Sequence, residues 1–213
     1  GTYYGARSGS EPHHVQADPR DWSVIAVNHT REAVRGAEIR AEVFDLTGQR
    51  LGDTQRKAVD IPAASTAAAF TVPAPDGDHP LHLVRLRLYD AAGDRLSENM
   101  YWRYGQARDL QALNDLARAE LDVSRNRVSR RNGRVSVTVT VRNKGRSVAP
   151  MVRLALRDRR TGNRVLPALY SDNYLWLLPG DEREVTVSCP PHALPGELVV
   201  TAQGYRTARA SSR

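Results

Sequence analysis

The sequence predicts an all-β protein made of two immunoglobulin-like antiparallel β-sandwiches in tandem, joined by a short, partly helical connector. Several short stretches alternate apolar and polar residues, turn residues separate them, and there is no strand–helix–strand rhythm. In three places an extended stretch runs into an Asp with a Gly three or four positions later, in Phe44–Gly48, Tyr89–Gly93 and Leu156–Gly162. Asp can bond its own backbone and Gly adopts positive φ without strain, so each block predicts a hairpin turn.

The length of 213 residues suits two domains of about 100 residues each. We place them at residues 1–104 and 105–213. No apolar stretch approaches the roughly 20 residues of a membrane span, so no membrane partner is expected. No export signal is present in the sequence. We expect an extracellular location as part of a parent enzyme, with any signal upstream of Gly1.

In the first half, each extended stretch has one apolar and one polar face. Ile39, Ala41 and Val43 share a face. Prolines lie between these stretches, where they remove no ladder donor. The expected strands are Trp22–Val27, Ala37–Asp45, Ala67–Val72, Leu81–Tyr89 and Arg95–Trp102.

The period changes to that of a helix between Gly105 and about Asp122, which we interpret as the connector. Asp109 is placed to cap its start. The residues spaced for one helical face are Leu110, Leu113, Leu116, Ala117 and Leu121.

The second half contains the most regular alternation of the chain, at Val135–Val141, which predicts a half-buried strand. Asn132-Gly133 predicts a turn just before it. The expected strands of this half are Leu121–Ser129, Arg134–Asn143, Met151–Arg157, Glu184–Cys189 and Glu197–Gly204.

Charge is unevenly divided between the halves. Residues 1–103 carry 12 basic and 14 acidic residues, a balance of −2, and residues 104–213 carry 19 and 10, a balance of +9. The arginines around one predicted turn have no interleaved aromatic residues, so we expect no nucleic-acid partner and favour a solvated turn or a docking surface for an acidic neighbour. They are Arg125, Arg127, Arg130, Arg131 and Arg134.

The sequence contains no catalytic constellation, and we assign no catalytic residue, no metal and no cofactor. Cys189 is the single cysteine, and it shares a predicted strand face with two valines, which indicates a buried and inert thiol. The adjacent His13 and His14, near predicted loops, have no carboxylate at metal-ligand spacing. Asn28-His29-Thr30 fits a glycosylation sequon, but Asn is also expected at a strand end for local bonding.

Exposed aromatic residues are the remaining candidates for a functional surface. Tyr101 and Trp102 close the first predicted sandwich, while Tyr170, Tyr174 and Trp176 lie in an unusual segment of the second. They can form a platform on which sugars stack, or they can pack in the core or at an interface.

That unusual segment, Tyr170–Asp181, resembles the Asp-Asn…Leu-Pro-Gly-acid signature in the C-terminal immunoglobulin-like domain of glycoside hydrolase family 2 β-mannosidases and exo-β-D-glucosaminidases. Three further motifs resemble the family in the same order: Tyr3–Arg7 with Glu11-Pro12, then Ser97–Trp102, then Asp109–Leu116. The opening motif is more similar to the exo-glucosaminidase branch. The catalytic barrel with its two glutamates, the jelly roll and the first immunoglobulin-like domain of the family have no counterpart here.

The resemblance implies the non-catalytic C-terminal accessory region of a retaining β-glycosidase, an exo-β-D-glucosaminidase acting on chitosan oligosaccharides. Its implied partner is the catalytic TIM barrel of the same polypeptide, and an oligosaccharide is a further candidate. The alternatives are an autonomous carbohydrate-binding module, a β-mannosidase tail and, third, a free-standing pair of adhesion or protein-interaction domains. The candidate carbohydrate or inter-domain contacts are Tyr101, Trp102, Asp172, Asn173, Tyr174 and Trp176.

We expect Tyr170–Asp181 to dock on that barrel. Asp172-Asn173 suits a tight turn and Pro179-Gly180 a second one. The residues between them are more apolar than a free loop requires. If Leu175 and Leu177 enter the domain's own core, Tyr174 and Trp176 remain for a neighbour.

Overall fold

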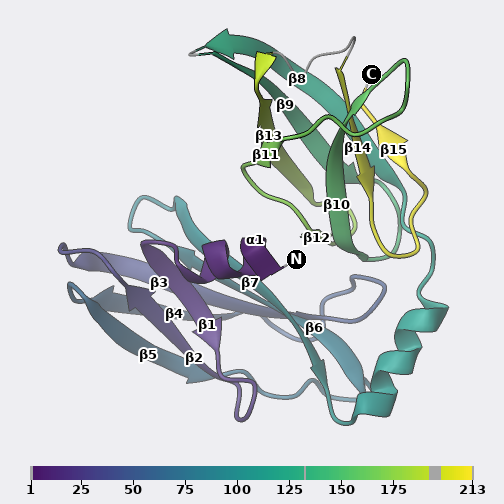
Figure 1. The fold of residues 1–213 in the computed structure, drawn as a ribbon. Coiled ribbons are helices and arrows are strands. Elements are labelled where there is room, and N and C mark those ends of the chain that lie inside the picture. Colours follow the sequence, from purple (N-terminus) through teal and green to yellow (C-terminus); the bar gives the residue numbers. More distant parts are fainter. Residues whose placement is uncertain (1, 132, 192–197, 213) are drawn as a thin grey trace. The chain divides into compact units, whose positions relative to one another are not determined.

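A computed structural model describes residues 2–131, 133–191 and 198–212. They divide into two compact units, Thr2–Asp115, here called the first sandwich, and the unit from Leu116 onward, called the second sandwich (Figure 1). Each unit consists of two antiparallel sheets. The predicted all-β class of immunoglobulin type is confirmed.

The first sandwich has one three-stranded sheet, β1-β2-β5, and one four-stranded sheet, β4-β3-β6-β7. Alternate residues of both sheets face each other and form one core, which includes Val24, Ile39, Ile61, Leu86 and Leu88. Its elements are α1 (Thr2–Gly9), β1 (His13–Ala17), β2 (Ser23–Asn28), β3 (Val34–Phe44), β4 (Gln55–Ile61), β5 (Ser65–Thr71), β6 (Leu81–Tyr89), β7 (Arg95–Tyr104) and the 3₁₀ helix η1 (Ala107–Asp115).

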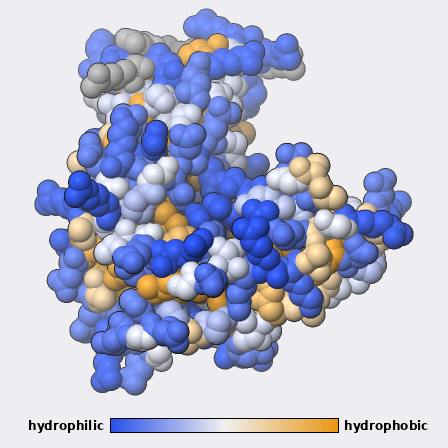
Figure 2. Space-filling view, turned by 180° about the vertical axis from the view of Figure 1, so that it is seen from behind, coloured by the Kyte–Doolittle hydropathy of each residue, from blue (hydrophilic) through white to orange (hydrophobic). Residues whose placement is uncertain are grey.

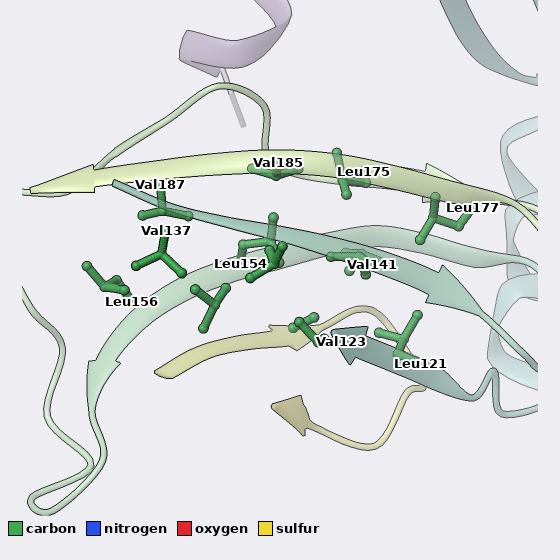
Figure 3. Packing of buried hydrophobic residues seen from close by; sticks show 14 of the residues in the cluster. Leu121, Val123, Val137, Val141, Leu154, Leu156, Leu175, Leu177, Val185 and Val187 are labelled. Atoms are coloured by element: carbon green, nitrogen blue, oxygen red, sulfur yellow. The ribbon is translucent and has the colours of Figure 1, made fainter. Parts of the chain in front are cut away.

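The second sandwich pairs the sheets β11-β13-β9-β8 and β12-β10-β14-β15. Its core is rich in valine, and Val141 of β9 is fully buried in it (Figure 3). Its elements are β8 (Leu121–Arg131), β9 (Arg134–Asn143), β10 (Ala149–Asp158), β11 (Leu169–Tyr170), β12 (Leu175–Leu177), β13 (Glu182–Cys189), β14 (Leu198–Gln203) and β15 (Ala210–Ser211).

The two sandwiches share one topology. In one sheet of each, β2 lies between β1 and β5 as β9 lies between β8 and β13. In the other, β3 lies between β4 and β6 as β10 lies between β12 and β14, and the last strand, β7 or β15, pairs with β6 or β14. β11, which pairs with β13, has no counterpart in the first sandwich. The other strands, taken in chain order, have matching neighbours in the two units.

The three predicted Asp-Gly turns are confirmed. The carboxylate of Asp45 accepts from the amides of Thr47 (2.9 Å) and Gln49 (2.8 Å). Asp90 and Asp158 hold their own turns in the same way, through bonds to Ala92 and Thr161. The glycines that follow have φ of 84°, 88° and 71° at Gly48, Gly93 and Gly162, which is why glycine is required there.

The connector differs from its prediction. The helix is a 3₁₀ helix that ends at Asp115, whereas Leu121 begins β8 and packs in the core of the second sandwich. Asp109 does not occupy the N-cap position before the helix. It is the third helical residue, and its carboxylate reaches back to the amides of Gly105 (3.1 Å) and Gln106 (2.8 Å), as the acidic residue of a capping box does. The helix packs on β6 and β7, within the unit Thr2–Asp115, and the boundary of independently folding domains at residues 104 and 105 stays a prediction.

The ten predicted strands are present, with ends displaced by at most a few residues. His13 and His14, expected near a loop, lie instead in strand β1. Two expectations fall partly outside the described residues, namely Asn132 of the predicted turn and Glu197 of the last predicted strand. Strands β1, β4, β11, β12 and β15 were not predicted, and all five lie at sheet edges.

Candidate functional site

Tyr101 packs within the first sandwich. Its ring meets Trp22 edge to face with centroids 5.9 Å apart, and its hydroxyl accepts from the amide of Ala17 (3.2 Å) and from Asn99 Nδ2 (2.8 Å). Burial raises the pKa of the Tyr101 phenol. Tyr101 thereby ties β1 to β7, while Trp102, the next residue, lies on the opposite face of the sheet and is half-buried.

The buried residues Ser97 and His14 form, with the half-buried Glu11, a cluster that resembles a catalytic triad in composition only. The hydroxyl of Ser97 donates to Glu11 Oε2 (3.1 Å) and lies 3.4 Å from His14 Nδ1. Glu11 Oε2 also lies 3.8 Å from this same nitrogen. A relay needs nucleophile and acid on opposite ring nitrogens. Because Ser97 Oγ also accepts from the amide of Val15, we interpret the cluster as a second tie between β1 and β7.

The motifs Glu11-Pro12 and Ser97–Trp102 therefore meet in space. Burial lowers the pKa of His14, against the opposing effect of Glu11. Both His14 and Ser97 are at most 5% exposed. Residues of two motifs that resemble the family, Glu11-Pro12 and Ser97–Trp102, thus hold strands of the first sandwich together.

A buried asparagine ends the same strand in each sandwich. Asn28, at the end of β2, is 1% exposed, and its Nδ2 donates to the carbonyls of Glu32, Ile61 and Pro62. This amide nitrogen is engaged and inaccessible, so the sequon is not a glycosylation site in the folded protein. Asn143, at the end of β9, donates to the carbonyls of Ser147 (2.8 Å) and Leu177 (3.0 Å). Each asparagine oxygen also accepts from the amide two residues later.

In the segment Tyr170–Asp181, the side-chain amide of Asn173 makes the hydrogen bonds that the main chain of a strand residue would otherwise make. Its Oδ1 accepts from the amide of Leu154 (2.7 Å) and its Nδ2 donates to the carbonyl of Leu154 (3.2 Å). The side chain thus continues the β10–β12 ladder beyond Leu175. The expected tight turn at Asp172-Asn173 is a bend instead, and Asp172 Oδ1 accepts from the amide of Asn173 (2.8 Å).

The next residues are held in a fixed orientation. Tyr174 has φ of 61°, and its amide donates to Asn173 Oδ1. Leu175 and Leu177 then enter the core as expected (Figure 3). Because side chains alternate along a strand, Trp176 lies on the outer face of this sheet, where it is half-buried. Tyr174 is also half-buried.

The predicted turn at Pro179-Gly180 is confirmed. The amide of Asp181 donates to the carbonyl of Leu178 (3.0 Å), and Gly180 has φ of 83°, as the third residue of a type II turn requires. The amide of Gly180 donates to the carbonyl of Asn143 (2.9 Å). The turn is therefore fastened to the end of β9.

Charged residues are arranged differently on the two units. On the outer face of β3, β6 and β7, Arg85 binds Glu42 (2.9 Å) and Arg87 binds Glu98 (2.6 Å), and Arg85 and Glu42 are 8% and 16% exposed. In the second sandwich, Lys144 and Asp122 form an ion pair (3.4 Å) in which both side chains are about half exposed. Hydrophilic residues cover most of the molecular face in Figure 2.

Within the described residues, no group of His, Cys, Asp and Glu side chains could hold a metal ion, and no helix there is long and apolar enough to cross a membrane. Cys189 is buried in the core, as predicted, and burial raises the pKa of its thiol. The carboxyl pKa shifts that are resolved, at Asp18, Asp21 and Asp158, are all downward. None of these carboxyls has the raised pKa of a glycosidase acid.

The chain matches two described families. The family described as exo-beta-D-glucosaminidase Ig-fold domain matches residues 99–207, and the family described as mannosidase Ig/CBM-like domain matches residues 20–103. The first match covers more than half of the chain.

Curated relatives and solved structures agree with these families. An exo-beta-D-glucosaminidase of Streptomyces avermitilis is 30% identical over 98% of this chain and 25% of its own length, and that of Amycolatopsis orientalis is 30% identical over 97% and 22%. The crystal structure of the Amycolatopsis orientalis exo-chitosanase CsxA matches with a TM-score of 0.86 at 29% identity, over 98% of this chain and 27% of that one. A β-D-mannosidase of Dictyoglomus thermophilum, 18% identical with a TM-score of 0.66, shares the fold. This chain spans about a quarter of the length of these curated relatives.

Proposed function

Since the chain belongs to the exo-β-D-glucosaminidase immunoglobulin-fold family and is an immunoglobulin-like region of glycoside hydrolase family 2, we propose that it is the non-catalytic C-terminal accessory region of an exo-β-D-glucosaminidase that acts on chitosan oligosaccharides. Its role is to support the catalytic TIM barrel and the edges of the substrate cleft. The observation that carries the proposal is the extent of the similarity, which runs over 98% of this chain but 25% of the relative.

The carboxylates of the chain support a non-catalytic role. A retaining glycosidase needs two carboxyls about 5–5.5 Å apart that flank the scissile bond, with the pKa of one of them raised. Here Glu42 and Glu98 are bound by arginines, and Asp45 and Asp90 hold turns. These four carboxylates therefore have structural roles, in ion pairs or in turns.

The fixed geometry of Tyr170–Asp181 supports a docking role. Asn173 pins one end of the segment to β10 and the turn at Gly180 pins the other to β9. With Leu175 and Leu177 in the core, Trp176 lies on the outer sheet face, where it is half-buried. A buried aromatic anchor commonly contributes about 2 kcal/mol or more to an interface. We propose that Trp176 is such an anchor against the rest of the enzyme.

An assay of the 213-residue chain tests the first part of the proposal. The pure chain should hydrolyse neither an aryl β-D-glucosaminide nor an aryl β-D-mannoside, whereas the complete enzyme should hydrolyse the glucosaminide. Turnover by the chain that disappears when one of its Asp or Glu residues is replaced would overturn the non-catalytic role. A complete enzyme that prefers the mannoside would overturn the substrate.

A second candidate function is an autonomous carbohydrate-binding module, with a β-mannosidase tail as a further alternative. The match of residues 20–103 to the mannosidase Ig/CBM-like family is the observation that supports these two alternatives. Calorimetry of the chain with glucosamine oligosaccharides separates these roles, because an accessory region should show no saturable heat and a binding module should. The proposed substrate, a polymer met outside the cell, also supports an extracellular setting.

A further inference from the structure

The outer face of the β12-β10-β14-β15 sheet gathers arginines. In β10 the side chains of Val152, Leu154 and Leu156 point into the core. Because side chains alternate along a strand, Arg153 and Arg157 lie on the opposite, outer face. Arg153 is exposed and Arg157 is half-buried.

Two more arginines border the same face. An antiparallel bridge pairs Arg157 with Arg164, so these residues are direct neighbours. In β15, Ala210 packs against the core, which directs Arg209 and Ser211 outward. Ser211 pairs with Thr201 of β14, and Thr201 pairs with Ala155, the residue between the two β10 arginines.

The arginines of this face have no carboxylate partner among the described residues. Within residues 116–131, 133–191 and 198–212, no ion pair joins Arg153, Arg157, Arg164 or Arg209 to a carboxylate. Burial, followed by repulsion from Arg209, Arg164 and Arg153, lowers the pKa of Arg157. An anion bound between them would relieve this repulsion.

One of the arginines is already fixed in position. Arg157 donates through Nη1 to the carbonyl of Gly162 (2.7 Å) and through Nε to Thr201 Oγ1 (3.3 Å). Arg153, Arg164 and Arg209 are exposed, and no hydrogen bond to another described residue holds their guanidinium groups. The face therefore combines one ordered guanidinium with three that can adapt to a ligand.

We propose that this face, here called the arginine face and defined by Arg153, Arg157, Arg164 and Arg209, binds an acidic polysaccharide that carries carboxylates, such as a uronic acid polymer. Guanidinium groups bind carboxylates in bidentate geometry. Gln203, which pairs with Arg153, and Ser211 are exposed between them and offer polar partners to sugar hydroxyls.

Other anionic polymers fit this face less well. β10, β14 and β15 contribute no aromatic side chain to this face, and Trp176 lies at its edge, on β12. The strands that carry the arginines therefore do not provide the successive aromatic side chains on which single-stranded nucleic acids stack their bases. A polymer whose charged groups alternate with hydroxyls uses both the arginines and the polar residues between them. The proposal concerns the second sandwich alone and does not depend on the proposed role in a glucosaminidase.

Affinity electrophoresis of the 213-residue chain in gels containing polygalacturonate tests the proposal. The chain should be retarded, and the double variant Arg153→Ala/Arg209→Ala should bind at least about fivefold more weakly, as expected for two exposed ion pairs. The matched control Arg127→Ala/Arg131→Ala removes the same charge from exposed positions of β8 and should keep the affinity. The side chains of these four arginines make no hydrogen bond to a described residue, so equal melting temperatures are expected.

Three outcomes would overturn the proposal. One is an equal loss of affinity in both double variants, which would indicate general attraction to net positive charge. Another is the absence of retardation in polygalacturonate. The third is tighter binding to single-stranded DNA or to anionic lipid vesicles than to polygalacturonate, which would assign the face to another class of partner.

Discussion

The two sandwiches share a topology and a buried asparagine at the end of the same strand, but the arginines on their outer sheet faces differ in whether they pair with carboxylates. A buried asparagine ends β2 in one and β9 in the other, and each donates to main-chain carbonyls. In the first sandwich, Arg85 and Arg87 are paired with glutamates on an outer sheet face. In the second, Arg153 and Arg209 on the arginine face have no such partner among the described residues. The topology is thus held by a few buried polar groups, and the outer faces are free to differ.

The largest expected effects come from the two buried asparagines. Asn143→Ala removes the partners of two carbonyls and one amide inside the second sandwich, and should cost about 3 kcal/mol. Asn28→Ala should act similarly on the first. Urea denaturation measures the loss, and hydrogen exchange resolved by peptide shows which unit loosens.

The exposed Asn126 provides the control, because Asn126→Ala should cost less than about 0.5 kcal/mol. If Asn143→Ala accelerated exchange equally in both units, the view of two independently closed sandwiches would be wrong.

The next largest loss of stability is expected from breaking the buried ion pair between Arg85 and Glu42. Glu42→Ala leaves Arg85, 8% exposed, without this carboxylate, and should destabilise the first sandwich by about 2 kcal/mol, because the variant breaks an ion pair that is largely buried. Asp122→Ala, which breaks an ion pair that is about half exposed, should cost less than about 0.5 kcal/mol. Chemical denaturation of both variants compares them directly, and equal costs would contradict the contrast in charge between the two units.

A tyrosine hydroxyl serves each sandwich in the same way and predicts a smaller effect. Tyr101 accepts from the amide of Ala17, and Tyr170 accepts from the amide of Leu156 (2.8 Å). Tyr101→Phe and Tyr170→Phe should each cost about 1 kcal/mol, because each leaves a main-chain amide without its partner. Thermal melts of the two variants check this. A neutral result for Tyr101→Phe would mean that the hydroxyl does not tie β1 to β7.

Acid should weaken the first sandwich before the second. Burial lowers the pKa of His14 and of His82 below the usual 6.5, so the unfolded chain binds protons more readily than the folded one. This lowers the stability as the pH falls below about 6.5. Asp158 of the second sandwich, with its lowered pKa, loses its contribution as the pH falls below 3.8. Hydrogen exchange at pH 7 and pH 5 should show loosening in residues 2–115 alone, and His14→Gln should reduce it; loosening confined to the second sandwich would contradict this assignment.

The inner strands were predicted well because their side chains alternate between the buried face and the outer face of the sheet. Val135–Val141 is buried on one face along its whole length, and its pattern is correspondingly regular. Each strand that escaped prediction is an edge strand, where pairing on one side requires little apolar pattern. β11 and β15 contain two residues each, too few for any period, and adjacent histidines obscure the pattern of β1.

The candidate site was predictable in part. The entry of Leu175 and Leu177 into the core follows from alternation, and so does the outward position of Trp176. The pairing of Asn173 with Leu154 could not be predicted, because it joins residues from separate strands through a side chain. The arginine face also depends on which strands are neighbours, and Arg164 and Arg209 belong to it only through sheet pairing.

Trp176→Ala in the complete enzyme is the measurement that tests the accessory role most directly. The variant should melt several degrees lower, in line with a loss of about 2 kcal/mol at an interface. Its kcat and KM for glucosamine oligosaccharides should stay unchanged at temperatures where it is folded. Val128→Ala, at a position that is 51% exposed on β8, should leave both properties unchanged. An unaltered melting temperature together with a raised KM would contradict the accessory role and favour a carbohydrate-binding module.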